Sequence, residues 1–259
     1  MNHSTAVSSK WTKTKVLTGS AYLDAHIPTT LRMTEASLRR LLGSFGLAYV
    51  KPESGSCGVG VMRVEREAGR WVVRDGIKRF SFGSYRQMYR WLAGRTAGVS
   101  YLAQRGIRVL HYRRRPVDFR VMIQKGKKVG WQVTGTAARV AHPRKAVTNG
   151  SQGGSIFEAS ILLRGLTGHE SSVRLLREFN GLARATAHRF ARSYPRMREF
   201  GLDIAVDRKH RTWILEVNTR PDPCPFAKLA DSSMLRKIVS FGRGYGRSYN
   251  LSCKKARRG

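Results

Sequence analysis

The stretch GLDIAVDRKHRTWILEVNTRPDP, residues 201–223, decides how this chain folds and where its chemistry lies. Two runs rich in alternating apolar residues flank the segment RKHR, a pattern that predicts a β-hairpin. We expect a two-residue turn at Lys209 and His210. That turn pairs the apolar residues of the two strands: Val206 with Trp213, Ile204 with Leu215, and Leu202 with Val217. The hairpin therefore presents one fully apolar face, which we expect to lie on a core.

The opposite face of this hairpin carries acidic and amide side chains. The same register places Asp203 opposite Glu216, with Asn218 two residues farther along the same face. Two carboxylates directly across a ladder repel each other unless a cation lies between them. Their oxygen atoms, with an amide oxygen, suit Mg²⁺ or Mn²⁺. On register alone, such a metal site and an ordinary solvated face with scattered charges are equal alternatives. Asp207 lies at the turn and Asp222 beyond the strand, so neither is an expected ligand.

The composition is strongly basic. The chain has 49 Lys and Arg residues against 16 Asp and Glu residues, a net charge of +33. A surplus of this size predicts affinity for polyanions such as nucleotides, nucleic acids, anionic polymers or acidic surfaces. The 259 residues can form one large domain or two small ones with a sizeable core.

Cysteine usage and the N-terminus bear on location. Cys57, Cys224 and Cys253 are odd in number and far apart in the sequence, which argues against a disulfide framework or a zinc site and favours a reducing compartment. The N-terminus has no apolar core typical of a signal peptide, and no apolar run approaches the ~18–20 residues of a membrane span. We therefore expect a cytoplasmic protein without a membrane span.

The remaining patterns mix helices with hairpins. Thr34 can cap a short helix that ends at Gly46, and the segment 171–194 is a long amphipathic helix that ends before Pro195. The segment 120–140 is typical of a second hairpin, which turns at KGKK. This mixture predicts an α+β architecture.

The segment KPESGSCGVG, residues 51–60, is rich in glycine. Glycines allow backbone N–H groups to approach phosphate oxygens closely. A Walker A loop is excluded, because no Gly-Lys-Ser/Thr closes the segment, and a dinucleotide-binding fingerprint is disfavoured, because GxGxxG is absent and a strand follows. Two interpretations remain: an ordinary hairpin loop, or a flap over a triphosphate with Lys51 reaching the phosphates.

Four further residues are of interest in the middle of the chain. Asp118 and Arg120 lie two apart on an expected strand and so share a face. They form either a surface ion pair of small energetic value or an Arg held to grip a phosphate or carboxylate. Taken alone, the segment AARVAHPRKAVTNGSQGGS, which contains Arg139 and Asn149, is a polar loop.

Taken together, these segments resemble the ATP-grasp superfamily, and most closely its YheC/YheD-like branch, which is associated with bacterial endospore coats. They are also similar to RimK-type glutamate ligases. The resemblance runs from about Lys10 to Pro225. It is carried by Asp203 followed by Glu216-x-Asn218, by YVKPESGSCGVGVMRV, by AQRGI, by DFR, by Arg139 with its Asn and Gly-Gly sequel, and by HIPTT. Gln104 departs from the pattern, since many relatives have an acid at that hinge position.

The resemblance implies an ATP-grasp fold of two α+β subdomains with the nucleotide between them. It implies four segments: a short basic N-terminal segment (1–33), a first subdomain with the glycine-rich flap (34–103), a second subdomain with the metal site (104–235), and a basic tail (236–259).

The resemblance also implies an activity: ATP- and Mg²⁺-dependent formation of an amide from a carboxylate and an amine through an acyl phosphate, on an acidic amino acid or peptide. It assigns Mg²⁺ or Mn²⁺ to Asp203, Glu216 and Asn218, and the acyl phosphate or acidic substrate to Arg120 and Arg139, with Asn149 near the γ-phosphate. It assigns ATP to the following residues: Lys51, Ser54, Gly55, Ser56, Gly58, Gly60, Gln104 and Ile107.

The alternative is a non-catalytic ATP-grasp relative that acts as a basic, polyanion-binding or structural spore protein. Its partner would be an anionic polymer or the spore-coat surface. Nucleic acid is the second choice of partner, because the sequence has no motif of a standard nucleic-acid module. Both interpretations are compatible with a cytoplasmic protein that associates with the spore.

Overall fold

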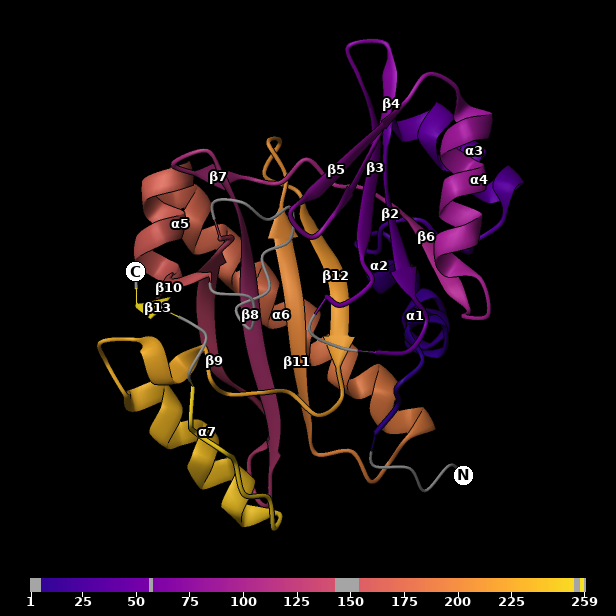
Figure 1. Ribbon diagram of the computed structural model, residues 1–259. Coiled ribbons are helices and arrows are strands. Elements are labelled where there is room, and N and C mark those ends of the chain that lie inside the picture. Colours follow the sequence, from indigo (N-terminus) through magenta and orange to yellow (C-terminus); the bar gives the residue numbers. More distant parts are fainter. Residues whose placement is uncertain (1–5, 56–57, 143–153, 254–256, 259) are drawn as a thin grey trace.

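The computed structural model describes residues 6–55, 58–142, 154–253 and 257–258 and contains two sheets with helices against them (Figure 1). Within these residues, the first sheet has the strand order β1-β6-β2-β3-β4-β5. Its strands are β1 (Thr30–Arg32), β2 (Leu47–Pro52), β3 (Met62–Glu67), β4 (Arg70–Asp75), β5 (Lys78–Phe82) and β6 (Tyr101–Arg105). Helices α3 (Glu35–Phe45) and α4 (Tyr85–Thr96) pack on it through Leu38, Leu42, Met88 and Leu92.

The second sheet has the order β12-β11-β8-β9-β10-β13 in the described residues, and β7 pairs with β8. Its strands are β7 (His111–Tyr112), β8 (Arg115–Gly126), β9 (Gly130–Val140), β10 (Ser155–Glu158), β11 (Glu199–Val206), β12 (Thr212–Asn218) and β13 (Arg257–Arg258). One face carries α5 (Ala159–Thr167) and α6 (His169–Ser193), and the other carries η2 (Phe226–Lys228) and α7 (Ser233–Gly244). These two α+β units confirm the predicted fold class.

Local signals explain the elements that the sequence predicts correctly. The Ser37 N–H donates to Thr34 Oγ1 (3.1 Å) and the Thr34 N–H donates to Ser37 Oγ (2.9 Å), so a capping box opens α3. Gly46 ends that helix with a positive φ of 68°, a conformation that favours glycine. Helix α6 ends at Ser193, before Pro195, and buries its apolar stripe on the second sheet.

The hairpin of β11 and β12 keeps part of the predicted register. Leu202 pairs with Val217 and Asp203 with Glu216, as the alternation predicts. Beyond Asp203 the register shifts, because Leu215 is an extra residue on β12 that bulges out of the ladder. The pairs then become Ile204 with Ile214, Ala205 with Trp213, and Val206 with Thr212.

The predicted pairs of Ile204 with Leu215 and Val206 with Trp213 are therefore wrong. Ile214 takes the place on the core that the pattern gives to Leu215, while Trp213 packs outside that core. The turn is also longer than two residues: the Asp207 N–H donates to Arg211 O (3.0 Å), and Asp207 Oδ1 accepts from the Lys209 and Arg211 backbone N–H groups. A carboxylate that satisfies the turn backbone explains this longer loop.

The N-terminal segment has more structure than its weak pattern indicates. It forms α1 (Lys10–Thr18) and α2 (Ala21–Asp24) before β1. Helix α1 lies beside α6 and β12 of the second sheet, whereas β1 pairs with β6 of the first. This segment thus joins both units, and the predicted boundary at residue 235 falls inside α7. The four-segment division of the chain stays a prediction.

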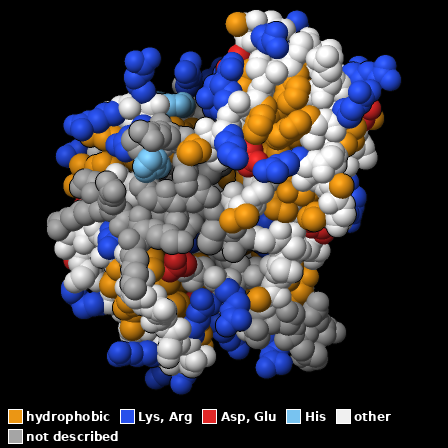
Figure 2. Space-filling model, viewed as in Figure 1, with side chains coloured by type: hydrophobic (Ala, Val, Ile, Leu, Met, Phe, Trp, Pro, Cys, Tyr) orange, Lys and Arg blue, Asp and Glu red, His pale blue; other side chains and the backbone are white. Residues whose placement is uncertain are grey.

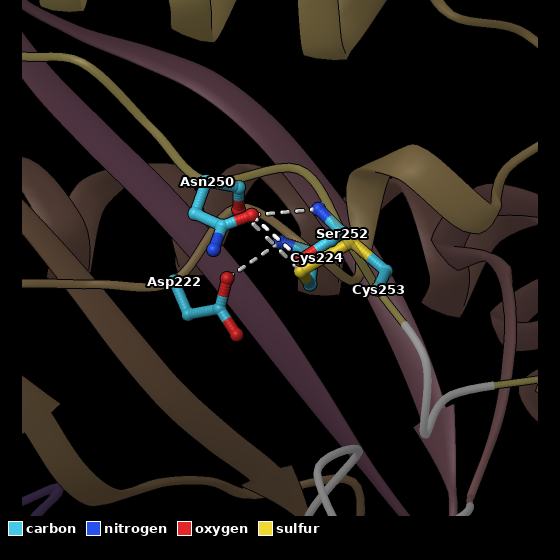
Figure 3. Close-up of a disulfide and its surroundings, with 5 residues drawn as sticks. All are labelled: Asp222, Cys224, Asn250, Ser252 and Cys253. Atoms are coloured by element: carbon cyan, nitrogen blue, oxygen red, sulfur yellow. Dashed lines mark hydrogen bonds between the residues drawn. A yellow bond between two sulfur atoms is a disulfide. The ribbon is translucent and has the colours of Figure 1, made fainter.

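The argument against a disulfide is wrong. Cys224 and Cys253 are bonded, with their Cα atoms 5.5 Å apart (Figure 3). Their separation in sequence is misleading because η2 and α7 carry the chain along the sheet and back to the loop that follows β12. Asp222 Oδ1 accepts from the Cys224 N–H at 3.0 Å beside this bond.

Across the described residues, no helix combines the length and the apolar character that crossing a bilayer requires.

Candidate functional site

A cleft is lined by residues of β2 and β6 of the first sheet and of β8, β9, β11 and β12 of the second. It encloses about 930 Å³, a volume that includes space open to solvent. The lining is Lys10, Tyr49, Lys51, Gly58, Val59, Val61, Gln104, Arg105, Ile107, Val109, Pro116, Val117, Asp118, Arg139, Asp203, Leu215 and Glu216. Several of these are apolar, and charged groups from both sheets converge among them.

The acidic pair of the β11–β12 hairpin opens into this cleft. Asp203 and Glu216 are direct cross-strand partners and both line it. Asp203 Oδ1 accepts from Arg120 Nε at 2.7 Å, and its Oδ2 lies 3.2 Å from Arg139 Nη2. The Asn218 amide donates weakly to the same Oδ2 at 3.5 Å. The predicted grouping of Asp203, Glu216 and Asn218 on one face is therefore confirmed.

Cross-strand register also sets the ion pairs beside it. Asp118 pairs with Arg139 across β8 and β9, and Arg120 pairs with Asp203 across β8 and β11. Arg139 binds Asp118 through two parallel bonds of 2.7 and 2.6 Å. Asp118 and Arg120 share a face, and each binds a partner on a neighbouring strand, Asp118 binding Arg139 and Arg120 binding Asp203. Neither pair is on the surface, since Asp118 and Arg120 are 2% and 7% exposed.

These pairs set the charge states of the groups. Burial alone would raise the pKa of Asp203, but the guanidinium groups of Arg120 and Arg139 bring it down to about 2. Burial opposes the charge of Arg139, and Asp118 and Asp203 outweigh it, so the pKa of Arg139 is raised. Asp203 and Arg139 are therefore both ionised at neutral pH.

Lys51 projects into the cleft from β2. Its ammonium donates to Gln104 Oε1 at 2.5 Å, and the Gln104 amide donates to Thr30 Oγ1 at 3.0 Å. Burial lowers the pKa of Lys51, while Glu216 opposes that effect. In the described part of the chain no carboxylate lies within 4.0 Å of the Lys51 ammonium. A half-buried cation whose hydrogen-bond partner is a neutral amide is suited to an incoming anion.

Two residues of α1, Lys10 in the cleft lining and Lys13 beside Glu216, are not singled out by the sequence patterns. Lys10 Nζ donates to Gly55 O (2.9 Å) and Pro52 O (3.1 Å) at the base of the glycine-rich segment. Lys13 is 7% exposed and lies 3.7 Å from Glu216 Oε1. The available signal is Ser9, which caps α1 by accepting from the Thr12 N–H. The helix lacks a strong apolar stripe, so periodicity does not reveal it.

The glycine-rich segment borders the cleft. Gly55, Gly58 and Gly60 have φ values of 115°, 70° and 71°, all in the range that favours glycine. At Gly60 a Cβ would also lie 2.9 Å from the Tyr101 hydroxyl.

The predicted site residues divide into four groups. Some line the cleft: Lys51, Gly58, Gln104, Ile107, Arg139, Asp203 and Glu216. Others lie next to lining residues: Gly55, Gly60, Arg120 and Asn218. Ser54, between Glu53 and Gly55, is described but is not in the cleft lining. Ser56 and Asn149 lie outside the described residues.

The acidic face suits a divalent metal in part. In the described ranges no group of three or more His, Cys, Asp and Glu side chains is placed to hold a metal. Glu216 and Asn218 supply the hard oxygen donors that Mg²⁺ prefers, and Glu216 has Lys13 as its described ion-pair partner. Both Asp203 oxygens already bind guanidinium groups, so Asp203 can join a metal only by exchanging one of them. The oxygen donors therefore fit Mg²⁺ in part, and Glu216 would be its first ligand.

Two curated proteins of Bacillus subtilis (strain 168) are similar to this chain. Endospore coat-associated protein YheD is 25% identical over 187 residues, which cover 70% of this chain and 41% of YheD. Endospore coat-associated protein YheC is 21% identical over 217 residues, which cover 82% of this chain and 59% of YheC. The chain thus spans about half the length of the curated relatives it matches.

Solved structures share the fold at low sequence identity. N5-carboxyaminoimidazole ribonucleotide synthetase PurK, solved as an ADP complex, is 10% identical with a TM-score of 0.51 over 92% of this chain and 52% of its own. D-cycloserine synthetase DcsG is 11% identical with a TM-score of 0.50 over 89% of this chain and 68% of its own. Both comparisons show the fold alone.

The family model described as YheC/D like ATP-grasp matches residues 1–247, nearly the whole chain and every element that lines the cleft. The two sheets, the cleft between them and this match lead to one conclusion: the chain belongs to the YheC/D-like ATP-grasp family.

Proposed function

We propose that this protein is an ATP- and Mg²⁺-dependent carboxylate–amine ligase that acts on an acidic amino acid or peptide. The observation that carries the proposal is the facing of Lys51 on one sheet by Glu216 and Arg139 on the other, across one cleft. Family membership supports nucleotide use, and the two related folds named above are both named synthetases.

The reaction has two steps. A carboxylate oxygen of the substrate attacks the γ-phosphorus of ATP, the bond to the bridging oxygen breaks, and ADP leaves. The amine nitrogen then attacks the carbonyl carbon of the acyl phosphate, phosphate leaves, and the amine releases a proton. Positioning and charge neutralisation supply most of the catalysis in phosphoryl transfer.

The residues of the cleft have matching roles in this proposal. The apolar walls at Ile107 and Leu215 take the base of ATP, and Lys51 with the amides around Gly58 takes the phosphates. Arg139 and Arg120 orient the acyl phosphate or the acidic substrate, and the proposal keeps Asn149 near the γ-phosphate. Glu216 and Asn218, with Asp203 after exchange, would hold Mg²⁺, which supplies charge neutralisation at the transferring phosphoryl group.

Nucleotide titration tests this function. The chain should show a thermal shift with ATP and Mg²⁺ and release ADP when acidic peptides and amines are supplied. Glu216→Gln should lose ADP release and most of the metal-dependent shift, because it removes a hard, charged oxygen ligand of nearly the same shape. Glu170→Gln, on α6, is a matched control that should behave as wild type. A wild-type chain that shows no ATP-dependent shift would overturn the proposal.

A second candidate is a non-catalytic relative that binds an anionic polymer or the spore-coat surface, in the cytoplasm or at the spore. The net charge of +33 favours it, and Figure 2 shows Lys and Arg side chains spread over the visible face with few acids between them. In that case polymer binding should weaken steeply with salt and persist unchanged in Glu216→Gln.

A further inference from the structure

Two hairpin turns lie together at one end of the second sheet. One joins β7 to β8 through Arg113 and Arg114, and the other joins β11 to β12 through residues 208–210. Val109 bridges to Asp207, and the Leu110 N–H donates to Val206 O at 2.8 Å, which holds the two turns side by side. The two turns and the residues next to them expose six cations, here named the basic strip: Arg108, Arg113, Arg114, Arg208, Lys209 and Arg211.

The basic strip has no acidic neutralisation of its own. Among the described residues, none of its six side chains lies within 4.0 Å of a carboxylate. Asp207 is the acid within these turns, and its oxygens accept from two backbone N–H groups and, at 2.9 Å, from Trp213 Nε1. Its hydrogen bonds are therefore used to build the turn. The strip remains open to anions from outside the chain.

The backbone conformation of the β7–β8 turn does not explain why Arg113 and Arg114 occupy it. Arg113 and Arg114 have φ values of 47° and 63°, and His210 in the second turn has a φ of 57°. Positive φ at both central residues is the two-residue hairpin geometry that favours Asn and Gly. Three of the four non-glycine residues with positive φ in the described chain lie in these two turns. Such strain indicates that the side chains have another use.

The basic strip is continuous with the cleft. Pro116 and Val109 line the cleft, and Pro116 pairs with His111 in the β7–β8 hairpin. Arg105 also lines the cleft and lies 4.7 Å from the centre of the Trp213 ring, which Arg211 covers at 4.3 Å. A chain bound along the turns can therefore place its end at the cleft.

The aromatic groups of this region decide the kind of partner. Trp213 is 3% exposed and carries both Arg105 and Arg211 on its ring, and Arg113 lies over Tyr112 at 5.3 Å. Single-stranded nucleic acid needs open aromatic faces on which its bases stack. Guanidinium groups without such faces favour carboxylates, which they can bind through two hydrogen bonds.

We propose that the basic strip docks an acidic polypeptide and feeds its carboxylates to the cleft. This inference deepens the proposed function, on which it rests, by locating the acidic substrate outside the nucleotide site.

Charge-removing variants test the docking of this polypeptide. Binding of a fluorescein-labelled oligoglutamate is measured by anisotropy at low and at physiological salt. Arg113→Gln with Arg114→Gln should weaken binding by about tenfold, since two exposed ion pairs are lost. The control, Lys127→Gln with Lys128→Gln, removes the same charge from the exposed turn at the opposite end of β8 and should leave affinity within about twofold.

A second variant separates docking from folding. Arg113→Asn with Arg114→Gly removes the same charges and also relieves the backbone, so its melting temperature should rise while its affinity for oligoglutamate falls. Three results would each overturn the proposal. The first is an equal loss of oligoglutamate affinity in the Arg113/Arg114 and Lys127/Lys128 variants. The others are tighter binding of single-stranded DNA of equal length, and unchanged oligoglutamate affinity in both Arg113/Arg114 variants.

Nucleotide binding, measured on the same preparations, keeps the two proposals distinct. The Arg113/Arg114 variants should keep the wild-type thermal shift with ATP and Mg²⁺, because they leave the cleft residues in place. If these variants bind ATP as the wild type does and their affinity for the peptide is unaltered, the docking proposal alone is overturned. If the protein binds the peptide through this turn but does not bind ATP at all, the ligase proposal alone is overturned.

Discussion

Asp203 is held as an anion by two guanidinium groups inside the protein. Its oxygens contact Arg120 and Arg139, and Arg139 also binds Asp118. A buried ion pair costs desolvation, and removal of one member leaves an uncompensated charge in the interior. This network therefore fixes the position of the acidic face before any ligand arrives.

The pKa of about 2 for Asp203 predicts a pH dependence of stability. An unfolded Asp has a pKa of about 4, so the folded group is the stronger acid, and its stabilisation is complete above about pH 4 and is lost as the pH falls through 2. We expect the free energy of unfolding of the wild type to lose about 2 kcal/mol more than that of Asp203→Asn over this range. Chemical denaturation at several pH values measures it.

Asp222→Asn is the matched control for that measurement. It removes an exposed carboxylate from the loop that follows β12. The prediction fails if Asp222→Asn reduces the fall in the free energy of unfolding at low pH as much as Asp203→Asn does.

At the scale of elements, the disulfide joins two segments that flank η2 and α7. The bond closes a loop with a sequence separation of 29 residues. Closing a loop of this length restricts the unfolded chain and stabilises by roughly 3–4 kcal/mol. Cys224→Ser with Cys253→Ser should lower the free energy of unfolding by that amount in oxidising buffer.

Reducing buffer supplies the control for the disulfide. There, the wild type and the double Ser variant should unfold at the same denaturant concentration. A wild type that is unaffected by reductant, or that binds a thiol-specific label at both cysteines while folded, would contradict the bond.

Sequence patterns predict those elements whose signals are local. The caps of α3 and the apolar stripe of α6 follow from residues a few positions apart. The facing of Asp203 by Glu216 follows from the alternation within a single hairpin. The bulge at Leu215 does not, because it depends on which of Leu215 and Ile214 fits the core once α6 is in place. The binding of Arg139 to Asp118 likewise depends on the pairing of whole strands, which the sequence alone leaves open.

Helix α1 shows the same limit. Its residues Lys13 and Leu17 are buried by both β12 and α6, which are distant in sequence, and its own apolar stripe is weak. Such a helix is formed by tertiary packing more than by its own periodicity. A search for sequence motifs therefore misses both Lys10, which lines the cleft, and Lys13, which contacts Glu216.

At the scale of the whole molecule, charge is the dominant feature. With a net charge of +33, the Lys and Arg side chains repel one another. The buried pairs of the cleft are screened little by salt, whereas the surface repulsion is screened strongly. Added salt should therefore weaken the repulsion among surface charges more than it weakens the attraction within the buried ion pairs.

This balance predicts that salt stabilises the fold. Raising NaCl from about 0.05 M to about 0.5 M, which shortens the screening length well below the spacing of surface charges, should raise the melting temperature by roughly 3 °C or more. Scanning calorimetry checks the shift, and a neutral osmolyte of equal osmolarity distinguishes screening from solvent exclusion. A melting temperature that falls with salt would show that surface ion pairs outweigh the repulsion.

The bulge at Leu215 has a consequence for how this hairpin can change. Because one residue of β12 is already outside the ladder, the part of the hairpin beyond it is paired independently of the Asp203–Glu216 rung. Insertions or deletions in the loop at 208–210 can then be absorbed above the bulge while the two carboxylates stay in place. The loop is thus a site at which relatives can vary in length, and at which a peptide tag can be grafted, without disturbing the acidic pair.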